Sequence, residues 1–276
     1  MPPRVASFVP EQGLLAAMPG YVGGTLATKL VSLFPGNEAL GIPTHQALIA
    51  VFDAETGAPT ALLDGTYITA MRTGASAAVA TRALAREDAR VLAVLGAGVQ
   101  ARSHLATVTL VRNFDEIRIA NRSQERAREL ADEAGATAVD SFEDAVRGAE
   151  VVCACTHAAE PILRREWLSP GTHVSSVGAS QEGPELDAET VTAGLLAVES
   201  RVAFEPPPAG AFELQGLVPE TAVELGEVVA GTRAGRTSDD EITVYKSMGH
   251  AVEDAAGAAL VLERARAERA GTEIEL

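Results

Sequence analysis

The feature that constrains the fold most is a short apolar run followed at once by a glycine turn. Residues 91–95 read Val-Leu-Ala-Val-Leu, residues 96–101 read Gly-Ala-Gly-Val-Gln-Ala, and an amphipathic segment runs on to about residue 111. This order predicts strand, tight turn and helix, the opening of a dinucleotide-binding βαβ unit. Gly96 permits the turn, Gly98 lets the backbone approach a pyrophosphate, and Ala101 keeps the helix close to the strand. The helix N-terminus offers free N–H groups to the phosphates.

Length and charge limit the class of protein. The 276 residues suit one large domain or two of ordinary size, and the formal net charge of −16 argues against a nucleic-acid partner. No apolar run approaches the roughly 18 residues of a membrane helix, and the first residues lack the pattern of a signal peptide. We therefore expect a cytoplasmic protein with no membrane partner.

A metal site is not expected. Cys153, Cys155 and His157 alternate along one apolar run, so they would lie on one face of a strand. An extended strand cannot wrap three ligands around one tetrahedral zinc ion. Buried thiols in a reducing compartment are the better interpretation.

The first third of the chain predicts an antiparallel sheet. Residues 28–34, 48–52 and 59–63 are typical of strands, with no helical pattern between them. Asp53 and Glu55 are interpreted as turn formers of the loop between the last two of these strands, and not as a catalytic carboxylate pair. A helix rich in small residues is predicted for most of 66–85.

From residue 90 onward, strands and helices alternate. The pattern predicts strands at 91–95, 116–120, 136–139, 151–155, 173–177 and 195–198, a helix at 123–134 closed by Gly135, and a last helix over about 250–269. The fold class is therefore α/β, a Rossmann-type doubly wound parallel sheet preceded by a smaller α+β region.

The end of the second strand of this sheet indicates which dinucleotide binds. An Asp or Glu there would bind the ribose 2′-hydroxyl of NAD. Asn121-Arg122-Ser123 stands there instead. A carboxylate would repel a 2′-phosphate, whereas a guanidinium and a hydroxyl can hold one, so NADP is favoured over NAD. Ser123 can also serve as a helix N-cap.

Two basic residues have more than one interpretation. Arg72 lies among small and apolar residues and needs an anionic partner, either an internal carboxylate or a ligand. Taken on its own position, Lys29 is typical of a strand lysine whose head group reaches solvent.

Five blocks in order carry a family resemblance, at 29–37, 53–59, 69–75, 96–101 and 241–249. On them the chain resembles the ornithine cyclodeaminase/mu-crystallin family over nearly its whole length. The resemblance implies a homodimer and a substrate-binding and dimerisation domain of residues 1–75 with 255–276. It further implies an NAD(P)-binding Rossmann domain of residues 76–254.

The resemblance also implies site residues. A substrate carboxylate would be held by Arg4, Lys29 and Arg72, with Lys29 and Arg72 catalytic, and the start of the last helix would lie near the nicotinamide. The predicted cofactor-binding residues are Gly96, Gly98, Val99, Gln100, Asn121, Arg122, Ser123, Thr156, Ser247 and Gly249.

Two departures from the family pattern matter, the first for the substrate and dimerisation domain and the second for the reaction. The chain begins where relatives have usually completed an opening helix and strand. Ser180 aligns with the aspartate that handles amine and water in cyclodeaminases, and a serine cannot act as a carboxylate base at neutral pH. Glu182, close by in sequence, is the weaker alternative for that role. The reductase branch, which includes ketimine reductases and alanine dehydrogenases, is therefore favoured.

The function predicted is NAD(P)H-dependent reduction of a small imino or keto acid, such as a cyclic imine 2-carboxylate. Lys29 would donate a proton to the imine nitrogen or polarise it. Two alternatives stay open: an NAD-dependent ornithine cyclodeaminase that releases ammonia, and a non-catalytic NADPH-binding protein of the crystallin kind.

Overall fold

A computed structural model describes residues 4–178 and 182–275, which form two compact units. Unit 1 comprises Met1–Arg72 with His250–Leu276, and unit 2 comprises Thr73–Gly249. The divisions expected from the sequence lie after residues 75 and 254. Ser180 of the sequence analysis lies outside the described residues.

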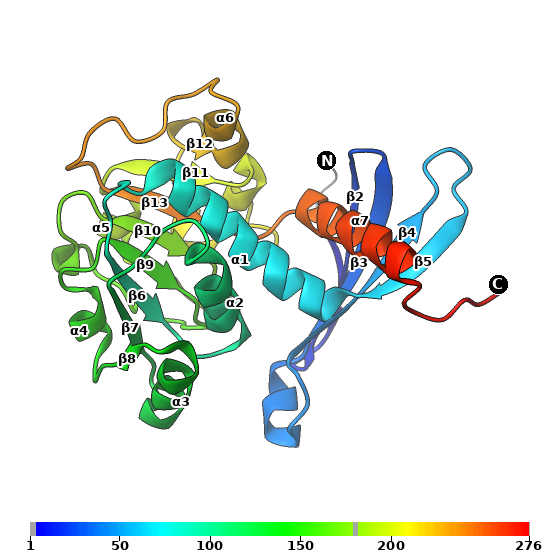
Figure 1. Cartoon of the computed structure of the whole chain (residues 1–276), viewed down its shortest axis with the longest axis horizontal. Coiled ribbons are helices and arrows are strands. Elements are labelled where there is room, and N and C mark those ends of the chain that lie inside the picture. The colour runs from blue at the N-terminus through cyan, green and yellow to red at the C-terminus, as the bar shows by residue number, and fades with distance from the viewer. Residues whose placement is uncertain (1–3, 179–181, 276) are drawn as a thin grey trace. The chain divides into compact units, whose positions relative to one another are not determined.

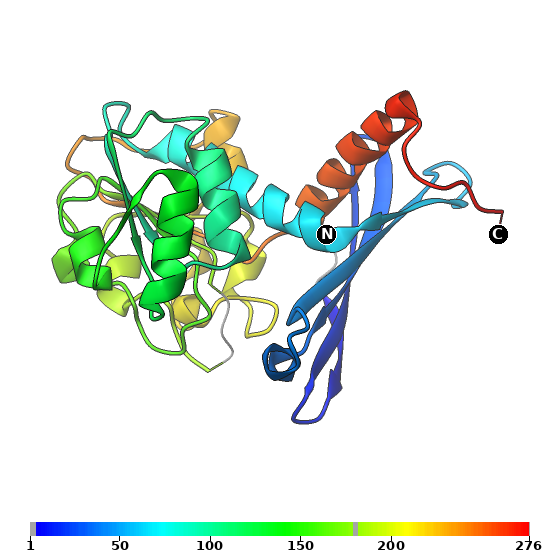
Figure 2. The same cartoon turned by 60° about the horizontal axis from the view of Figure 1, so that its bottom comes forward.

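Unit 1 is an antiparallel sheet with one covering helix. The strands follow chain order as β1 (Val5–Val9), β2 (Gly13–Val22), β3 (Thr25–Leu33), β4 (His45–Phe52) and β5 (Pro59–Asp64), and a 3₁₀ turn (Pro35–Leu40) joins β3 to β4. Helix α7 (Ala251–Glu268) packs on β2, β3 and β4 (Figure 1). In the turned view of Figure 2, α7 lies on one side of the sheet. The predicted strands correspond to β3, β4 and β5, whereas β1 and β2 were not predicted.

Strand alternation explains which face α7 covers. The residues buried under the helix recur at every second position of the strands, as the pleat requires: Leu14, Ala16 and Met18; Ala27, Lys29 and Val31; Ala47, Ile49 and Val51. The helix contributes Ala251, Ala255 and Ala258. Its backbone comes so close that a Cβ atom on Gly20 would lie 2.8 Å from the Ala251 carbonyl oxygen. Lys29 is therefore a charged residue on the buried side.

Unit 2 is a doubly wound parallel sheet, which confirms the predicted fold class. Within the described residues it has eight strands in the order β12-β11-β13-β10-β9-β6-β7-β8, and every pairing is parallel. The strands are β6 (Val91–Leu95), β7 (Glu116–Ala120), β8 (Thr137–Ala138), β9 (Val151–Ala154), β10 (His173–Ser176), β11 (Leu195–Val198), β12 (Val223–Glu224) and β13 (Thr243–Lys246). Strand β12 and the interior strand β13 were not predicted.

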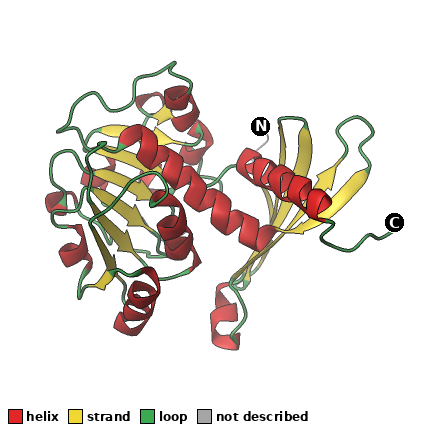
Figure 3. Ribbon diagram, in the orientation of Figure 1, coloured by secondary structure: helices red, strands yellow, loops and turns green. Residues whose placement is uncertain are grey.

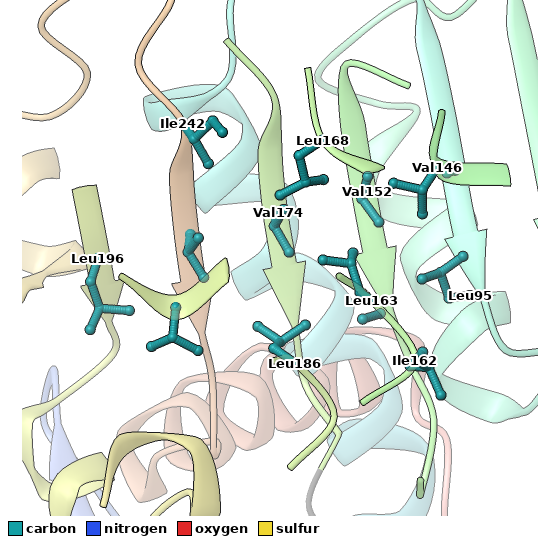
Figure 4. Packing of buried hydrophobic residues seen from close by; sticks show 14 of the residues in the cluster. Leu95, Val146, Val152, Ile162, Leu163, Leu168, Val174, Leu186, Leu196 and Ile242 are labelled. Atoms are coloured by element: carbon teal, nitrogen blue, oxygen red, sulfur yellow. The ribbon is translucent and has the colours of Figure 1, made fainter. Parts of the chain in front are cut away.

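Helices cover both faces of this sheet (Figure 3). On one face, the buried side chains of α1 (Gly65–Leu84, of which residues 73–84 belong to unit 2), α2 (Val99–Val108) and α3 (Gln124–Ala134) pack on β6, β7 and β9. The other face packs against α4 (Phe142–Val146), α5 (Ala188–Val191) and loop residues. Figure 4 shows part of that core, with Leu95, Val152 and Val174 from three strands. The short helix α6 is Leu225–Val229. The strands are thus buried on both sides, as parallel strands require.

Chain order reverses between β6 and β9. From β6 the chain winds outward through β7 and β8, then returns to β9 and winds the other way through β10. In open α/β sheets ligands bind outside the carboxyl ends of the strands at such a switch point. The glycine turn after β6 lies at this point.

None of the helices in the described parts of the chain is long and apolar enough to cross a membrane.

Candidate functional site

The turn after β6 has the geometry that a pyrophosphate needs. Gly96 has φ +116°, and a Cβ atom there would lie 2.7 Å from the Cys155 carbonyl oxygen, so only glycine fits. Gly98 is the N-cap of α2, no side chain caps this helix start, and a Cβ on Gly98 would meet no atom within 4 Å. The helix start is therefore not capped by a described side chain and has room beside Gly98, so the residues present fit a dinucleotide phosphate.

The two residues after Gly98 have different surroundings. The Val99 side chain is exposed at the helix start. The Gln100 carbonyl oxygen accepts a hydrogen bond from Ser103 Oγ and lies 2.7 Å from His104 Nδ1 inside the helix. Val99 thus borders the open turn, whereas the backbone of Gln100 is engaged in the helix.

The segment after β7 keeps its basic residue at the surface. Asn121 Nδ2 donates to the Ser123 carbonyl oxygen, and Ser123 Oγ accepts from the Arg126 N–H as the N-cap of α3. Arg122 is exposed, and its side chain makes no ion pair with any described residue. Because no described carboxylate pairs with it, the Arg122 guanidinium at the end of β7 is available to an anionic ligand.

The remaining predicted cofactor residues lie at the carboxyl ends of β9 and β13. Thr156 follows β9, and both its N–H and its hydroxyl donate to Glu185 Oε1 at 2.7 Å. Ser247 is buried, and its hydroxyl accepts from the Gly249 N–H at 3.2 Å. Gly249 has φ +71°, which turns the chain before α7. Glu185 was not singled out from the sequence.

In unit 1, the predicted substrate residues belong to a buried ionic cluster. Lys29 of β3 is only 2% exposed, and its Nζ lies 2.8 Å from Asp254 Oδ2. Arg72 Nε lies 2.9 Å from Asp254 Oδ1, and Arg72 Nη1 lies 2.8 Å from Glu253 Oε2. Interpreting Lys29 as a strand lysine with its head group in solvent is therefore wrong. Arg72, which was expected to have an anionic partner, pairs with two internal carboxylates.

Burial and neighbouring charges tune this cluster. Burial lowers the pKa of Lys29 to about 8, assisted by the positive charges of Arg72 and Arg4, while Asp254 opposes the shift. Arg4 is thus close enough to act on Lys29, so the three predicted basic residues gather in one region. Burial, with the charges of Lys29 and Arg72, also lowers the pKa of His45 to about 4, so its ring is neutral at pH 7.

Sequence reasoning missed the carboxylates of this cluster. Glu253 and Asp254 lie in the first turn of α7, where acidic residues are common because the helix dipole favours them. A better signal was spacing: Ala251, Asp254, Ala255 and Ala258 recur at helical intervals, and all four are buried on one side of α7. An aspartate in a stripe of alanines at that spacing indicates a buried carboxylate with a cationic partner.

Two other interpretations are confirmed. Asp53 Oδ1 accepts from the N–H groups of Glu55 and Thr56 and from the Thr56 hydroxyl, as a turn former does. Cys153 and Cys155 are buried free thiols, and burial raises the pKa of Cys153 to about 12. His157 lies beyond the end of β9.

Together these features define a class of protein: an α/β unit with a dinucleotide-binding turn, joined to an α+β unit that buries an ionic cluster. The chain belongs to the ornithine cyclodeaminase/mu-crystallin family, whose model matches residues 1–269. The family predicted from the sequence is confirmed.

Relatives of known name support this class. The chain is 39% identical over 264 residues to the ketimine reductase mu-crystallin of Mus musculus, covering 94% of this chain and 83% of that protein. A solved structure of the Δ1-pyrroline-2-carboxylate reductase of Thermococcus litoralis, in complex with NADH and L-proline, matches with TM-score 0.92 and 36% identity, covering 99% of this chain and 89% of the other. An archaeal alanine dehydrogenase dimer with bound NAD matches with TM-score 0.90 and 32% identity, covering 100% and 88%. These relatives confirm the predicted enzyme class, an NAD(P)-dependent oxidoreductase.

Proposed function

We propose that this protein reduces a small cyclic imine 2-carboxylate, or a related imino or keto acid, at the expense of NADPH. The observation that carries the proposal is the buried cluster of Lys29, Arg72 and Asp254 in unit 1. A buried lysine with a lowered pKa beside a paired arginine is typical of a site that both binds an anion and moves a proton.

The charge of the cluster suits one carboxylate. Arg4, Lys29 and Arg72 contribute three positive charges, and Glu253 and Asp254 contribute two negative ones. A small anion would therefore be attracted to a site of net positive charge within a protein of net charge −16. Binding the carboxylate fixes the neighbouring carbon, and such positioning can lower a barrier by about 7–11 kcal/mol in favourable cases.

Lys29 would supply the proton of the reaction. A bound dinucleotide would supply the hydride of the reduction. Lys29 Nζ would donate a proton to the imine nitrogen, so that the product is the cyclic amino acid. Lys29 is left neutral, which its burial favours, and regains a proton from water. Its pKa of about 8 leaves most molecules charged at pH 7 while easing proton loss.

The dinucleotide is proposed to be NADPH. Gly96, Gly98 and the start of α2 would hold the pyrophosphate, and the exposed Arg122 would pair with the 2′-phosphate. The segment after β7 offers no carboxylate at residues 121–123 that would repel this phosphate.

The direct test is NADPH oxidation measured with pyrroline-2-carboxylate, piperideine-2-carboxylate, and pyruvate with ammonia. We expect turnover with at least one of them, and its loss in Lys29→Met and Arg72→Ala variants that still bind NADPH. NADPH binding without consumption would favour the non-catalytic alternative. Ammonia and proline formed from ornithine, without net NADPH consumption, would favour the cyclodeaminase.

We also propose a homodimer formed through the outer face of the unit 1 sheet, the face opposite α7. Leu30 of β3 and Leu48 of β4 are register partners there, and both side chains are exposed. Val5, Leu15 and Leu62 are exposed on the same face of neighbouring strands. A contiguous apolar surface of this kind indicates a protein contact, and a second copy offers a self-complementary partner.

A further inference from the structure

The nucleotide unit contains a buried charged network at the carboxyl ends of β9, β10 and β13, which no part of the proposed reaction explains. It comprises Thr156, Ser176, Gly178, Glu185, Glu213 and Lys246. The three strands are neighbours in the sheet. The network therefore lies at the edge where ligands of such sheets bind.

Glu185 links two of these strand ends. Its carboxylate accepts four hydrogen bonds: Oε1 from the N–H and hydroxyl of Thr156, and Oε2 from Ser176 Oγ at 2.7 Å and from the Gly178 N–H at 3.0 Å. The side chain is almost wholly buried. Four donors satisfy an ionised carboxylate at this depth, and they fix the backbone just beyond β9 and β10.

Lys246 binds the same residue, Gly178, through its carbonyl oxygen. It is the last residue of β13 and fully buried, and its Nζ donates to the Gly178 carbonyl oxygen at 2.6 Å and to Ser176 Oγ at 3.0 Å. Glu213 Oε1 lies 3.2 Å from this ammonium and accepts from the Glu185 N–H. Gly178 is thus hydrogen-bonded at its N–H by Glu185 and at its carbonyl by Lys246.

These contacts leave no room for a side chain at residue 178. A Cβ atom there would lie 2.4 Å from the Glu185 carboxyl carbon. Burying such charges is costly, and well-packed apolar residues often give equal or greater stability. A gain in stability therefore does not account for the network, whereas a fixed backbone at a ligand-binding edge does.

We propose that Glu185 and Lys246 are positioning residues for the nicotinamide half of the dinucleotide. This inference rests on the proposed use of NADPH. A dinucleotide spans the two halves of a Rossmann sheet, so with the 2′-phosphate at β7 and the pyrophosphate at β6, the nicotinamide half belongs at β9 and β10. By holding the backbone at Thr156 and Gly178, the network sets the surface on which that half rests.

The test compares two ligands that share the adenosine half. NADPH and 2′-phospho-ADP-ribose are titrated into wild-type protein and into Glu185→Gln, Lys246→Met and the milder Ser176→Ala. We expect the first two variants to weaken NADPH binding about tenfold or more while changing 2′-phospho-ADP-ribose binding less than about twofold. Ser176→Ala, which removes only the bridging hydroxyl, should shift NADPH in the same direction by a smaller factor.

Arg236→Met is the matched control. Arg236 donates to the carbonyl oxygens of Leu84 and Gly171 and to Thr243 Oγ1, at the start of β13. Its loss removes a half-buried cation from the opposite edge of the sheet, so we expect a lower melting temperature with an unchanged ratio of the two affinities. Equal weakening of both ligands by Glu185→Gln and Lys246→Met, or a selective loss in Arg236→Met, would overturn the proposal. If wild-type protein binds neither ligand, the proposed cofactor fails; if it binds both but reduces no imine, only the proposed substrate fails.

Discussion

At the scale of single residues, Asp254 determines how Lys29 behaves. One carboxylate oxygen pairs with Lys29 and the other with Arg72, so a single aspartate orients both cations. Burial and the charges of Arg72 and Arg4 lower the pKa of Lys29, and Asp254 is what keeps it from falling further. The protonation of the proposed proton donor therefore depends on a residue that need not touch the substrate.

A prediction follows for Asp254→Asn. The proposed reaction needs charged Lys29, so kcat/KM should fall as pH rises through its pKa of about 8. Removing the Asp254 charge removes an interaction that raises this pKa, so the alkaline limb should move to lower pH. The measurement is kcat/KM for imine reduction against pH.

Glu253→Gln is the control, because Glu253 lies beside Asp254 in the first turn of α7 and pairs with Arg72. Its limb should stay near pH 8. Identical limbs in wild type and Asp254→Asn would show that Lys29 is not the group that titrates.

Residues were harder to predict than elements. The family blocks indicated Lys29 and Arg72, but position alone suggested a solvated lysine, because an isolated β3 strand does not reveal that α7 covers it. Asp254 is 225 positions further along the chain than Lys29, and Glu185 acts through backbone atoms that no motif marks. Long-range pairing of this kind depends on tertiary structure and leaves only weak local signals.

At the scale of elements, the β6–α2 turn contains one glycine that the fold requires and one that leaves space for a ligand. Gly96 is required by its positive φ and by the nearby Cys155 carbonyl, whereas a methyl group on Gly98 would meet none of the described atoms within 4 Å. The two glycines of one motif thus have different reasons to be glycine.

We predict that Gly98→Ala folds normally and binds NADPH poorly. The added methyl group should cost less than about 1 kcal/mol at a helix N-cap, but it occupies the space through which a pyrophosphate approaches. We expect at least about tenfold weaker binding and little change in melting temperature, measured by fluorescence titration and circular dichroism. Gly226→Ala, where a Cβ also meets no atom, should change neither. Unimpaired NADPH binding in Gly98→Ala would remove this turn from the proposed site.

The segment after β7 carries a second prediction. Arg122→Ala should weaken NADPH by about 10- to 100-fold, the range expected when a charge-assisted contact is lost, and should leave NADH nearly unchanged. Arg128→Ala, an exposed arginine of α3, is the control. Competition between NADPH and NADH in steady-state kinetics measures the ratio of their affinities. A ratio that does not change would show that Arg122 does not read the 2′-phosphate.

Most elements followed from sequence because their signals are local. The strand and helix patterns of unit 2 matched at β6, β7, β9, β10 and β11, and Ser123 caps α3 as expected. The missed strands had reasons of their own. In β2, residues 14–18 are all apolar and show no alternation with polar residues, and Pro19 and Gly20 are uncommon in strands. Strand β13 has only four residues and ends in a lysine, although that lysine is fully buried. Neither pattern indicates a strand without its neighbours.

At the scale of the whole molecule, the two faces of the unit 1 sheet have different properties. The face toward α7 buries the ionic cluster, and the outer face exposes Leu30 and Leu48 side by side. If the outer face joins two copies, β3, which carries Lys29, is covered on both of its faces. Assembly and substrate binding would then depend on the same strand.

This arrangement gives the last prediction. Leu48 is 55% exposed, so Leu48→Asp should leave the isolated fold intact while burying a carboxylate in the proposed contact between copies. We expect the dimer to dissociate at least about tenfold more readily, measured by analytical ultracentrifugation over a range of concentrations. Leu110→Asp, at an 82% exposed position in unit 2, should sediment as wild type does. A Leu48→Asp protein that stays dimeric would move the contact to another surface, and a monomeric wild type would leave the outer face without its proposed partner.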